Sequence, residues 1–317
     1  MTRPSVLLLR ALGLGDFLTG VPAYRAVRAA FPGHEIVLAA PPVLTPLARL
    51  TGAVDVVVPT VELGPVALPR PPELAVDLHG DGPASHRVVE GVGAGRVLEF
   101  ASAAAPDVAG PWWDDGEHEV TRWCRLLAWG GIAADPAALR IDPPRDPGAS
   151  HVLVHPGAAY GSRRWPPDRF ARVARALRDR GHRVLVSGGG GERALAAEVA
   201  ERAGLPYTSV LAGRTGLMEL AGYVAAAELV VCGDTGVSHL ATACGTPSVT
   251  LFGPVSPALW GPPAGSARHL VLWKGGDAGR PGDAHGDAPD PRLLAVTPDE
   301  VLDRCDRLVS ADVPARG

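Results

Sequence analysis

Lysine, methionine and aromatic residues are scarce in this chain of 317 residues. Lys274 is the single lysine, two residues are methionine, and Phe, Trp and Tyr together make up 5%. The net charge is only −4 and no basic stretch is present, which argues against a nucleic-acid partner. No apolar run approaches the length that crosses a bilayer. With 46% hydrophobic residues, the composition predicts a soluble globular protein rather than a disordered one.

Cysteines are few and lie far apart in the sequence. None belongs to a CxxC pair, so neither a zinc site nor a disulfide framework is indicated, and we expect buried free thiols. The first residues lack the charged, apolar and small-residue regions of a signal peptide. We therefore expect a cytoplasmic location. The four cysteines are Cys124, Cys232, Cys244 and Cys305.

Short apolar runs alternate with amphipathic stretches along the whole chain, which predicts α/β architecture with parallel sheets. The length exceeds that of one ordinary domain. A Pro-rich stretch at 141–150 is the best linker candidate. We expect two doubly wound, Rossmann-like domains, 1–148 and 149–296, facing each other across a cleft. Residues 297–317 are expected to form a final helix and tail, which could pack back on the first domain.

The stretch RALGLGDFLTG follows the first apolar run and precedes a helical pattern at 17–31. Its Gly-Leu-Gly resembles the dinucleotide fingerprint, but Leu18 stands where the third glycine is needed. Gly13 and Gly15 still allow a sharp turn and a close approach to a ligand. Asp16 then lies at the carboxyl end of the sheet, where such folds bind ligands. Its alternative role is to cap the helix.

The stretch LVVCGDTGVSHLATACG places Gly-Asp-Thr-Gly between a buried strand and a helix. Backbone N–H groups near Thr235 and Gly236 would lie at the positive end of that helix, which suits a diphosphate. Asp234 could accept hydrogen bonds from sugar hydroxyls, or cap the helix. His239, one turn further on, could donate to a phosphate or a sugar, or be a bystander.

Two further glycine-rich turns follow strands in the second half. In HPGAAYGSRRWPPDRF, Gly157 opens the loop and Arg163 stands two residues before Trp165. The planar guanidinium suits phosphate oxygens. In VSGGGGERAL, Glu192 could bind ribose hydroxyls or cap a helix.

The chain resembles glycosyltransferase family 9, the ADP-heptose:lipopolysaccharide heptosyltransferase family, which has the GT-B fold. Three stretches carry the resemblance, together with ELAVDLHGDGPASH, where Asp77 ends a strand and Ser85 lies beyond it. They are RALGLGDFLTGVPAYRAVRAAFP, HPGAAYGSRRWPPDRF and GDTGVSHLATACGTPSVTLFGP. The resemblance implies an inverting, metal-independent transfer of a sugar, such as heptose, from a nucleoside diphosphate to an acceptor hydroxyl.

The resemblance also implies roles for individual residues. Asp16 corresponds to the family's catalytic aspartate, the general base. The donor-binding positions correspond to Arg163, Glu192, Asp234, Thr235, Gly236 and His239. Arg163 replaces the usual lysine, and Ala158 and Ala159 replace hydroxyl residues that contact phosphate, so donor and acceptor can differ from those of the lipopolysaccharide enzymes.

We expect a monomer that needs a nucleotide-sugar donor, such as ADP-heptose, and no metal or other cofactor. The acceptor is expected to be a glycan, a glycolipid or a small molecule, and a lipid-linked acceptor would bring the protein to the inner face of the cell membrane. Two alternatives stay open. One is a nucleotide-sugar epimerase of the same fold, and the other is a nucleotide-sugar-binding protein without catalytic activity.

Overall fold

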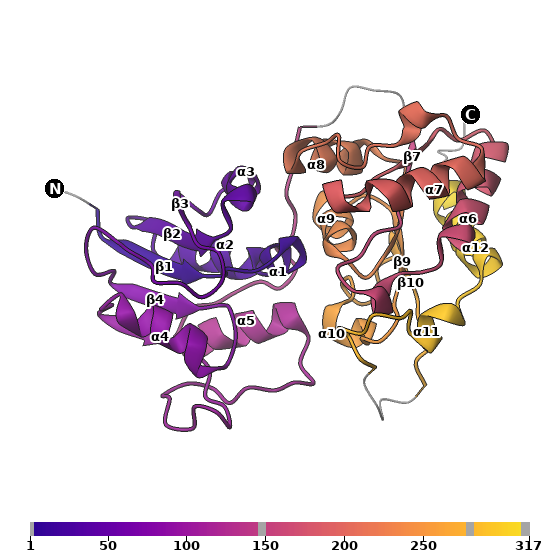
Figure 1. The fold of residues 1–317 in the computed structure, drawn as a ribbon. Helices are drawn as coiled ribbons and strands as arrows, with labels where there is room; N and C mark the ends of the chain where they lie inside the picture. Colours follow the sequence, from indigo (N-terminus) through magenta and orange to yellow (C-terminus); the bar gives the residue numbers. More distant parts are fainter. Residues whose placement is uncertain (1–2, 145–149, 277–281, 312–317) are drawn as a thin grey trace. The chain divides into compact units, whose positions relative to one another are not determined.

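The computed structural model describes residues 3–144, 150–276 and 282–311. The chain divides into two compact units, residues 1–141 and 142–317. The expected boundary at 148/149 falls seven residues later, in a stretch that lies outside the described residues. Each unit contains one five-stranded parallel sheet with helices packed against it, as Figure 1 shows. Among the described residues, no helix has the length and apolar character needed to span a membrane.

The sheet of the first unit has the strand order β3-β2-β1-β4-β5. The three inner strands, at 5–9, 35–40 and 74–77, are short and mainly apolar and buried, as expected for a parallel sheet that is covered on both faces. The strands are β1 (Ser5–Leu9), β2 (Glu35–Ala40), β3 (Val56–Pro59), β4 (Leu74–Asp77) and β5 (Arg96–Leu98). The α-helices described in this unit are α1 (Leu14–Thr19), α2 (Val21–Ala30), α3 (Thr45–Leu50), α4 (Pro83–Gly91) and α5 (Glu119–Trp129).

The sheet of the second unit has the order β10-β9-β8-β6-β7. Its strands are β6 (Val152–His155), β7 (Val184–Val186), β8 (Leu229–Gly233), β9 (Ser248–Leu251) and β10 (His269–Leu272). The α-helices described here are α6 (Pro167–Asp179), α7 (Arg193–Ala203), α8 (Leu217–Ala226), α9 (Gly236–Cys244), α10 (Pro257–Trp260), α11 (Pro291–Leu294) and α12 (Pro298–Ala311). A hydrophobic core that includes Trp165 and Phe170 lies between the helices and this sheet.

Strand order reverses once in each sheet. In the first sheet, the chain moves from β1 outward to β3 and then returns to place β4 on the other side of β1. In the second sheet, β6 lies between β7 and β8. The loops that leave the two strands at a reversal diverge to opposite faces, which leaves room for a ligand at the carboxyl ends of the strands. The two reversals, β1/β4 and β6/β8, are therefore the places where a site is expected.

Two helical regions can be compared with the sequence expectation. The helical pattern at 17–31 forms two helices separated at Gly20. The Tyr24 side chain lies so close to Gly20 that a Cβ there would collide with the ring. The last helix, α12, packs on α6, and its Val301 and Cys305 lie in the core of the second unit. Its core contacts therefore lie in the second unit.

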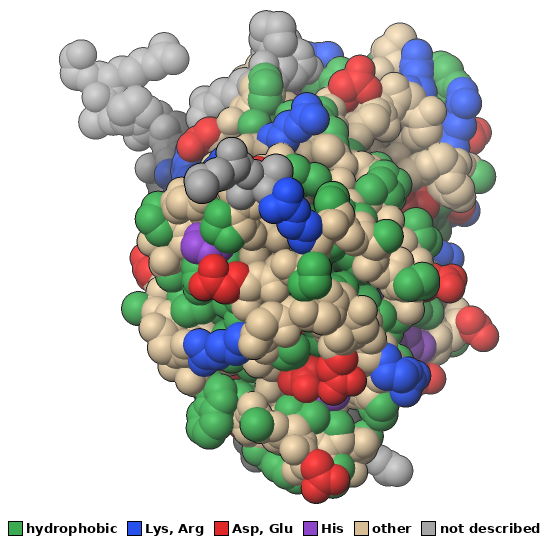
Figure 2. Space-filling view, turned by 90° about the vertical axis from the view of Figure 1, so that its left-hand side faces the viewer, with side chains coloured by type: hydrophobic (Ala, Val, Ile, Leu, Met, Phe, Trp, Pro, Cys, Tyr) green, Lys and Arg blue, Asp and Glu red, His purple; other side chains and the backbone are tan. Residues whose placement is uncertain are grey.

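The surface shows charges of both signs. On the face in Figure 2, Lys and Arg side chains alternate with Asp and Glu side chains among apolar and polar ones. This distribution agrees with the small net charge of −4. It offers no strongly basic surface on that face.

Candidate active site

The reversal in the first sheet brings Asp16 to the carboxyl end of β1. Gly13 occupies the N-cap of α1 without a side-chain capping bond, and Asp16 is the third residue of the helix. The Asp16 carboxylate accepts main-chain hydrogen bonds at Asp16 and Gly13, so it helps to cap the first turn of α1 although Gly13 is the N-cap. Its side chain remains 31% exposed, which leaves the carboxylate accessible to a substrate.

Arg10 is a fully buried arginine that connects the elements around Asp16. It directly follows β1 and is 0% exposed. Its guanidinium donates to the main-chain oxygens of Asp16, at 2.8 Å, and Leu78. It also donates to the Thr19 hydroxyl at 3.1 Å. Arg10 therefore links α1 to the segment after β4, and these hydrogen bonds fix the position of the Asp16 main chain.

Two carboxylates compensate the charge of Arg10. Nη2 of Arg10 lies 2.9 Å from Oε1 of Glu119 and 3.9 Å from Oδ1 of Asp16. Burial raises the pKa of Asp16 above its ordinary value, the charge of Arg10 opposes this rise, and Glu119 adds to it. A carboxyl whose pKa is raised in this way binds a proton more readily than a solvated aspartate. The electrostatic surroundings of Asp16 thus favour proton acceptance.

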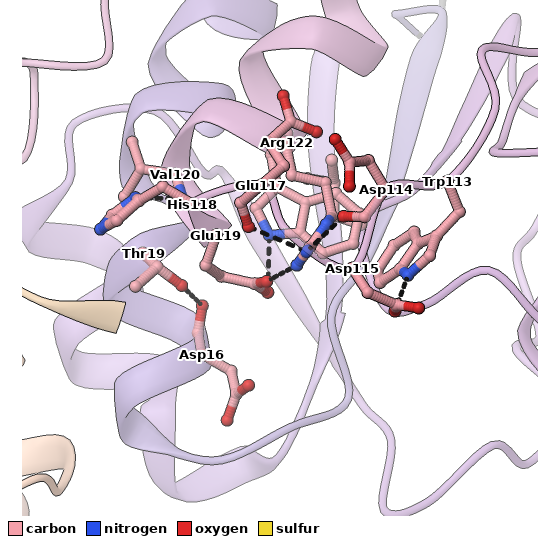
Figure 3. Close-up of polar contacts among 12 residues, drawn as sticks. Asp16, Thr19, Trp113, Asp114, Asp115, Glu117, His118, Glu119, Val120 and Arg122 are labelled. Atoms are coloured by element: carbon pink, nitrogen blue, oxygen red, sulfur yellow. Dashed lines mark hydrogen bonds and ion pairs between the residues drawn. The ribbon is translucent and has the colours of Figure 1, made fainter. Parts of the chain in front are cut away.

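Glu119 extends the network into α5, as Figure 3 shows. Its Oε1 accepts a hydrogen bond from the Trp123 indole at 3.0 Å, and its Oε2 is paired with Arg122. The Arg10 guanidinium lies 4.6 Å from the centre of the Trp123 ring. In Figure 3, Thr19 donates to the main chain of Asp16 while the Asp16 carboxylate extends away from Glu119. Arg10 and Glu119 carry no sequence signal that would pair them, and only the fold brings them together.

The reversal in the second sheet brings together the loops that follow β6 and β8. Nη1 of Arg163 lies 3.2 Å from Oδ2 of Asp234, which is 4% exposed. Nε of Arg163 is buried and has no hydrogen-bond partner among the described residues. A buried donor without a partner is unfavourable, so an anionic ligand that accepted its proton would relieve that penalty.

Helix α9 begins beside this ion pair. Thr235 is the N-cap, and its hydroxyl accepts a hydrogen bond from the Val237 amide at 3.3 Å. The cap is therefore Thr235 and not Asp234, whose carboxylate pairs with Arg163 instead. Gly236 is the first residue of the helix. The N–H groups of this first turn and the Arg163 guanidinium provide positive potential at one end of β8.

His239 lies one turn into α9. Its ring is partly exposed and makes an edge contact with Trp260, with 6.0 Å between the ring centroids. The aromatic contact orients the imidazole near the start of the helix. This arrangement is compatible with a polar contact to a ligand at the N-terminus of α9.

Glu192 and Gly157 meet where the loops after β6 and β7 come together. One Glu192 oxygen, Oε2, accepts a hydrogen bond from the Gly189 amide at 2.7 Å, so the residue does act as a cap. The carboxylate also lies so close to Gly157 that a Cβ at that position would collide with it. The position of Glu192 therefore requires glycine at 157. The sequence did not reveal this close contact between the two residues.

The loop after β6 contains two alanines, Ala158 and Ala159. Ala158 is buried, and its carbonyl oxygen accepts a hydrogen bond from Nε of Arg164 at 2.9 Å. This bond positions the backbone of the loop without a hydroxyl side chain. Ala159 is exposed.

A family model described as glycosyltransferase family 9 (heptosyltransferase) matches residues 133–278. The chain is similar to lipopolysaccharide heptosyltransferase 2 of Escherichia coli K12, with 34% identity over 160 residues, 49% of this chain and 45% of the relative. It is also similar to lipopolysaccharide heptosyltransferase 1 of Pseudomonas aeruginosa, with 36% identity over 126 residues, 39% of this chain and 35% of the relative. In both cases the match spans less than half the length of the relative.

Solved structures share the fold over nearly the whole chain. A glycosyltransferase family 9 protein from Veillonella parvula has a TM-score of 0.80 at 18% identity, covering 98% of this chain and 99% of that one. ADP-heptose lipopolysaccharide heptosyltransferase II of E. coli has a TM-score of 0.76 at 21% identity, covering 97% and 99%. The chain therefore has the α/β GT-B fold.

Proposed function

Because a glycosyltransferase family 9 model matches residues 133–278, we propose that this chain transfers a sugar from a nucleoside diphosphate sugar to an acceptor hydroxyl. The observation that carries this proposal is the Arg163–Asp234 pair beside the N-terminus of α9, at the strand reversal of the second sheet. An arginine and a helix N-terminus at such a reversal form a site suited to a diphosphate. The second unit is thus the donor-binding unit.

The diphosphate is proposed to bind between the first turn of α9 and Arg163. Thr235 and Gly236 lie at the start of the helix, and Nε of Arg163 still lacks a partner. Negative charge that develops on the leaving diphosphate would be stabilised by these fixed groups, without reorganisation during the reaction. Asp234, held by Arg163, is placed to accept a hydrogen bond from a donor hydroxyl. His239 supplies a further polar contact.

Glu192 is proposed to contact the nucleoside. Only its Oε2 is engaged by the Gly189 amide. A ribose hydroxyl could donate to the other carboxylate oxygen, which lies over Gly157. Glu192 would then both cap its turn and position the nucleoside, so the two roles that the sequence leaves open are compatible.

Asp16 is proposed to remove the proton of the acceptor hydroxyl. Attack by that oxygen on the anomeric carbon from the face opposite the diphosphate would invert the configuration there. The raised pKa and partial exposure of Asp16 suit this role. General-base assistance of this kind contributes about 10²- to 10⁴-fold in rate. The reaction requires the Asp16 carboxylate and the donor site to act on one pair of substrates.

Transfer is proposed to need no divalent cation at the diphosphate. The charge there is balanced by Arg163 and by the helix N-terminus, and Asp234 is already paired with Arg163 at 3.2 Å. A metal-dependent site would instead direct carboxylates at the cation. Donor binding measured by calorimetry is therefore expected to be the same with and without a chelator.

ADP-heptose is the proposed donor, because a structural neighbour is named an ADP-heptose heptosyltransferase and the similar curated proteins are named lipopolysaccharide heptosyltransferases. The proposed acceptor is a lipopolysaccharide-type glycan, which would bring the protein to the inner face of the cell membrane. A thermal-shift series with ADP-, GDP-, UDP- and dTDP-sugars tests the donor. A donor that binds only the folded state raises the melting temperature by mass action.

Substitution Asp16→Asn tests the mechanism. The variant is expected to bind the donor with unchanged affinity in calorimetry and to lose transfer by about 10²- to 10⁴-fold. Asp107→Asn, at an exposed aspartate of the same unit, is the matched control and is expected to retain full activity. Unchanged turnover in Asp16→Asn would remove Asp16 from the mechanism. Product formed without any acceptor would instead identify an epimerase, and donor binding without turnover a binding protein.

A further inference from the structure

Three ionisable side chains of the first unit meet in its interior. Asp77 is the last residue of β4, His86 lies on α4, and Glu99 directly follows β5. They are 0%, 3% and 8% exposed. One nitrogen or oxygen atom from each residue lies within 4.8 Å of the atoms from the other two. The proposed transfer reaction uses none of them.

Unpaired polar atoms are concentrated at this cluster. Ten buried side-chain nitrogen or oxygen atoms lack a hydrogen-bond partner in the described part of the chain, and four of them belong to these three residues. They are Oδ2 of Asp77, both ring nitrogens of His86 and Oε2 of Glu99. Native proteins leave few such atoms unpaired, so four in one place indicate a missing partner.

One partner that accepts electron pairs would satisfy all three groups together. Oδ1 of Asp77 already accepts the His79 amide at 2.8 Å, whereas Oδ2 is buried without a hydrogen-bond partner among the described residues. An ionised carboxylate donates electron pairs through its oxygens, and a neutral imidazole donates one through its unprotonated nitrogen. A cation satisfies all three at once and compensates two negative charges.

We propose that Asp77, His86 and Glu99 form a binding site for one divalent transition-metal ion of the Zn²⁺ type. An imidazole with two carboxylates suits zinc, manganese or iron(II) better than magnesium or calcium, which prefer oxygen ligands alone. Three protein ligands leave at least one position for water. Metal–ligand distances of about 2.0–2.2 Å place the ligand atoms roughly 3–3.6 Å apart, so small side-chain rotations close the site.

The fold supports this assignment independently of ligand chemistry. The carboxyl ends of β4 and β5 are neighbours in the parallel sheet, and α4 connects them. The site therefore joins three elements at the ligand-binding edge of the sheet.

This ion would be separate from the proposed donor site. It lies in the first unit, beside the main-chain oxygen of Leu78 that Arg10 binds, and its expected role is to hold the segment after β4 in place. The ligands are spread over 77–99 in a spacing that matches no short metal-binding motif. For that reason the sequence predicted no metal.

Zn²⁺ binding to the full chain tests the proposal. After treatment with a chelator, isothermal titration with ZnCl₂ is expected to give one site per chain, and MgCl₂ is expected to give none. The variants His86→Ala and Glu99→Gln are expected to weaken Zn²⁺ binding by at least about 100-fold, the upper end of the effect of losing a second-shell contact. Zn²⁺ is expected to raise the melting temperature of the wild type but not that of His86→Ala.

His34→Gln is the matched control, because His34 forms a surface pair with Glu73 in the same unit, at 2.8 Å. It is expected to bind Zn²⁺ like the wild type. Glu99→Gln preserves side-chain shape and keeps the test valid if His86→Ala fails to fold. A wild type that shows no stoichiometric Zn²⁺ binding, or a Glu99→Gln variant that binds as tightly as the wild type, would overturn the proposal. The two carboxyl groups would then share protons instead.

Discussion

Replacing Arg10 by methionine is expected to destabilise the first unit by about 3 kcal/mol. Arg10 is 0% exposed, and its partner Glu119 has a side chain that is 5% exposed. Removing one partner of a buried ion pair typically costs about 3–5 kcal/mol, because the remaining charge stays buried without compensation. Arg122 still pairs with Glu119 in the variant, so we expect the lower end of that range.

Methionine is the appropriate replacement because it is unbranched and keeps much of the contact with the Trp123 ring. What is lost is the charge and the hydrogen bonds to Leu78, Asp16 and Thr19. The effect is therefore electrostatic rather than a cavity effect. For a unit of this size, a loss of about 3 kcal/mol lowers the melting temperature by roughly 6–12 °C.

Differential scanning calorimetry measures this effect directly. Arg172→Met is the matched control, because Arg172 pairs with Asp299 at 2.7 Å while both side chains are largely exposed. Such surface pairs contribute at most about 1 kcal/mol. The double variant Arg10→Met/Glu119→Gln is expected to be less stable than Arg10→Met, since the buried Arg122 guanidinium then loses its carboxylate partner. If Arg10→Met destabilises no more than Arg172→Met, the network around Arg10 does not hold the first unit together.

Three further predictions concern other sites. Gly157→Ala is expected to weaken donor binding, measured by calorimetry, by roughly 10-fold or more, because the new Cβ would displace Glu192. An unchanged affinity would show that Glu192 does not contact the donor. Glu300 has its pKa lowered to about 2, first by its bond from Lys274, so its contribution to stability is complete above about pH 4.5 and is lost as the pH falls toward 2. Glu300→Gln should remove that part of the acid dependence in denaturant melts, and an identical pH profile would contradict it. Because the pKa of Asp16 is raised, kcat/KM is expected to fall with decreasing pH before a solvated aspartate would protonate, and a flat profile down to pH 4 would exclude it as the base.

Local sequence pattern was sufficient to place the main elements of each sheet. The apolar runs at 5–9, 35–40 and 229–233 are strands, because continuous hydrophobic stretches of this length suit a parallel sheet covered on both faces. Gly-Asp-Thr-Gly also predicted the start of α9, since strand and helix are adjacent in the chain. The sequence pattern thus predicted where a phosphate-type site could form and which residues would carry it.

Other features depended on residues that are distant in the chain. In the sequence, Val301 and Cys305 indicate only that the last helix has an apolar face. In the structure, that helix packs on α6 and contributes to the core of the second unit. The strands β5 and β10 were missed because they are short and partly exposed, so their pattern is weak. Side-chain periodicity indicates that a face is buried but not what it is buried against.

The amino-acid sequence alone determined the α/β class of fold and placed Asp16, Arg163 and Asp234 in the segments that follow apolar runs, because these features depend on residue type and on neighbours in the chain. Only the tertiary structure decided that Arg10 pairs with Glu119 and that Asp77 meets Glu99. Those contacts join residues that lie on different strands and helices. The burial of these residues and the compensation of their charges depend on how distant segments of the chain pack together, which no local sequence pattern encodes.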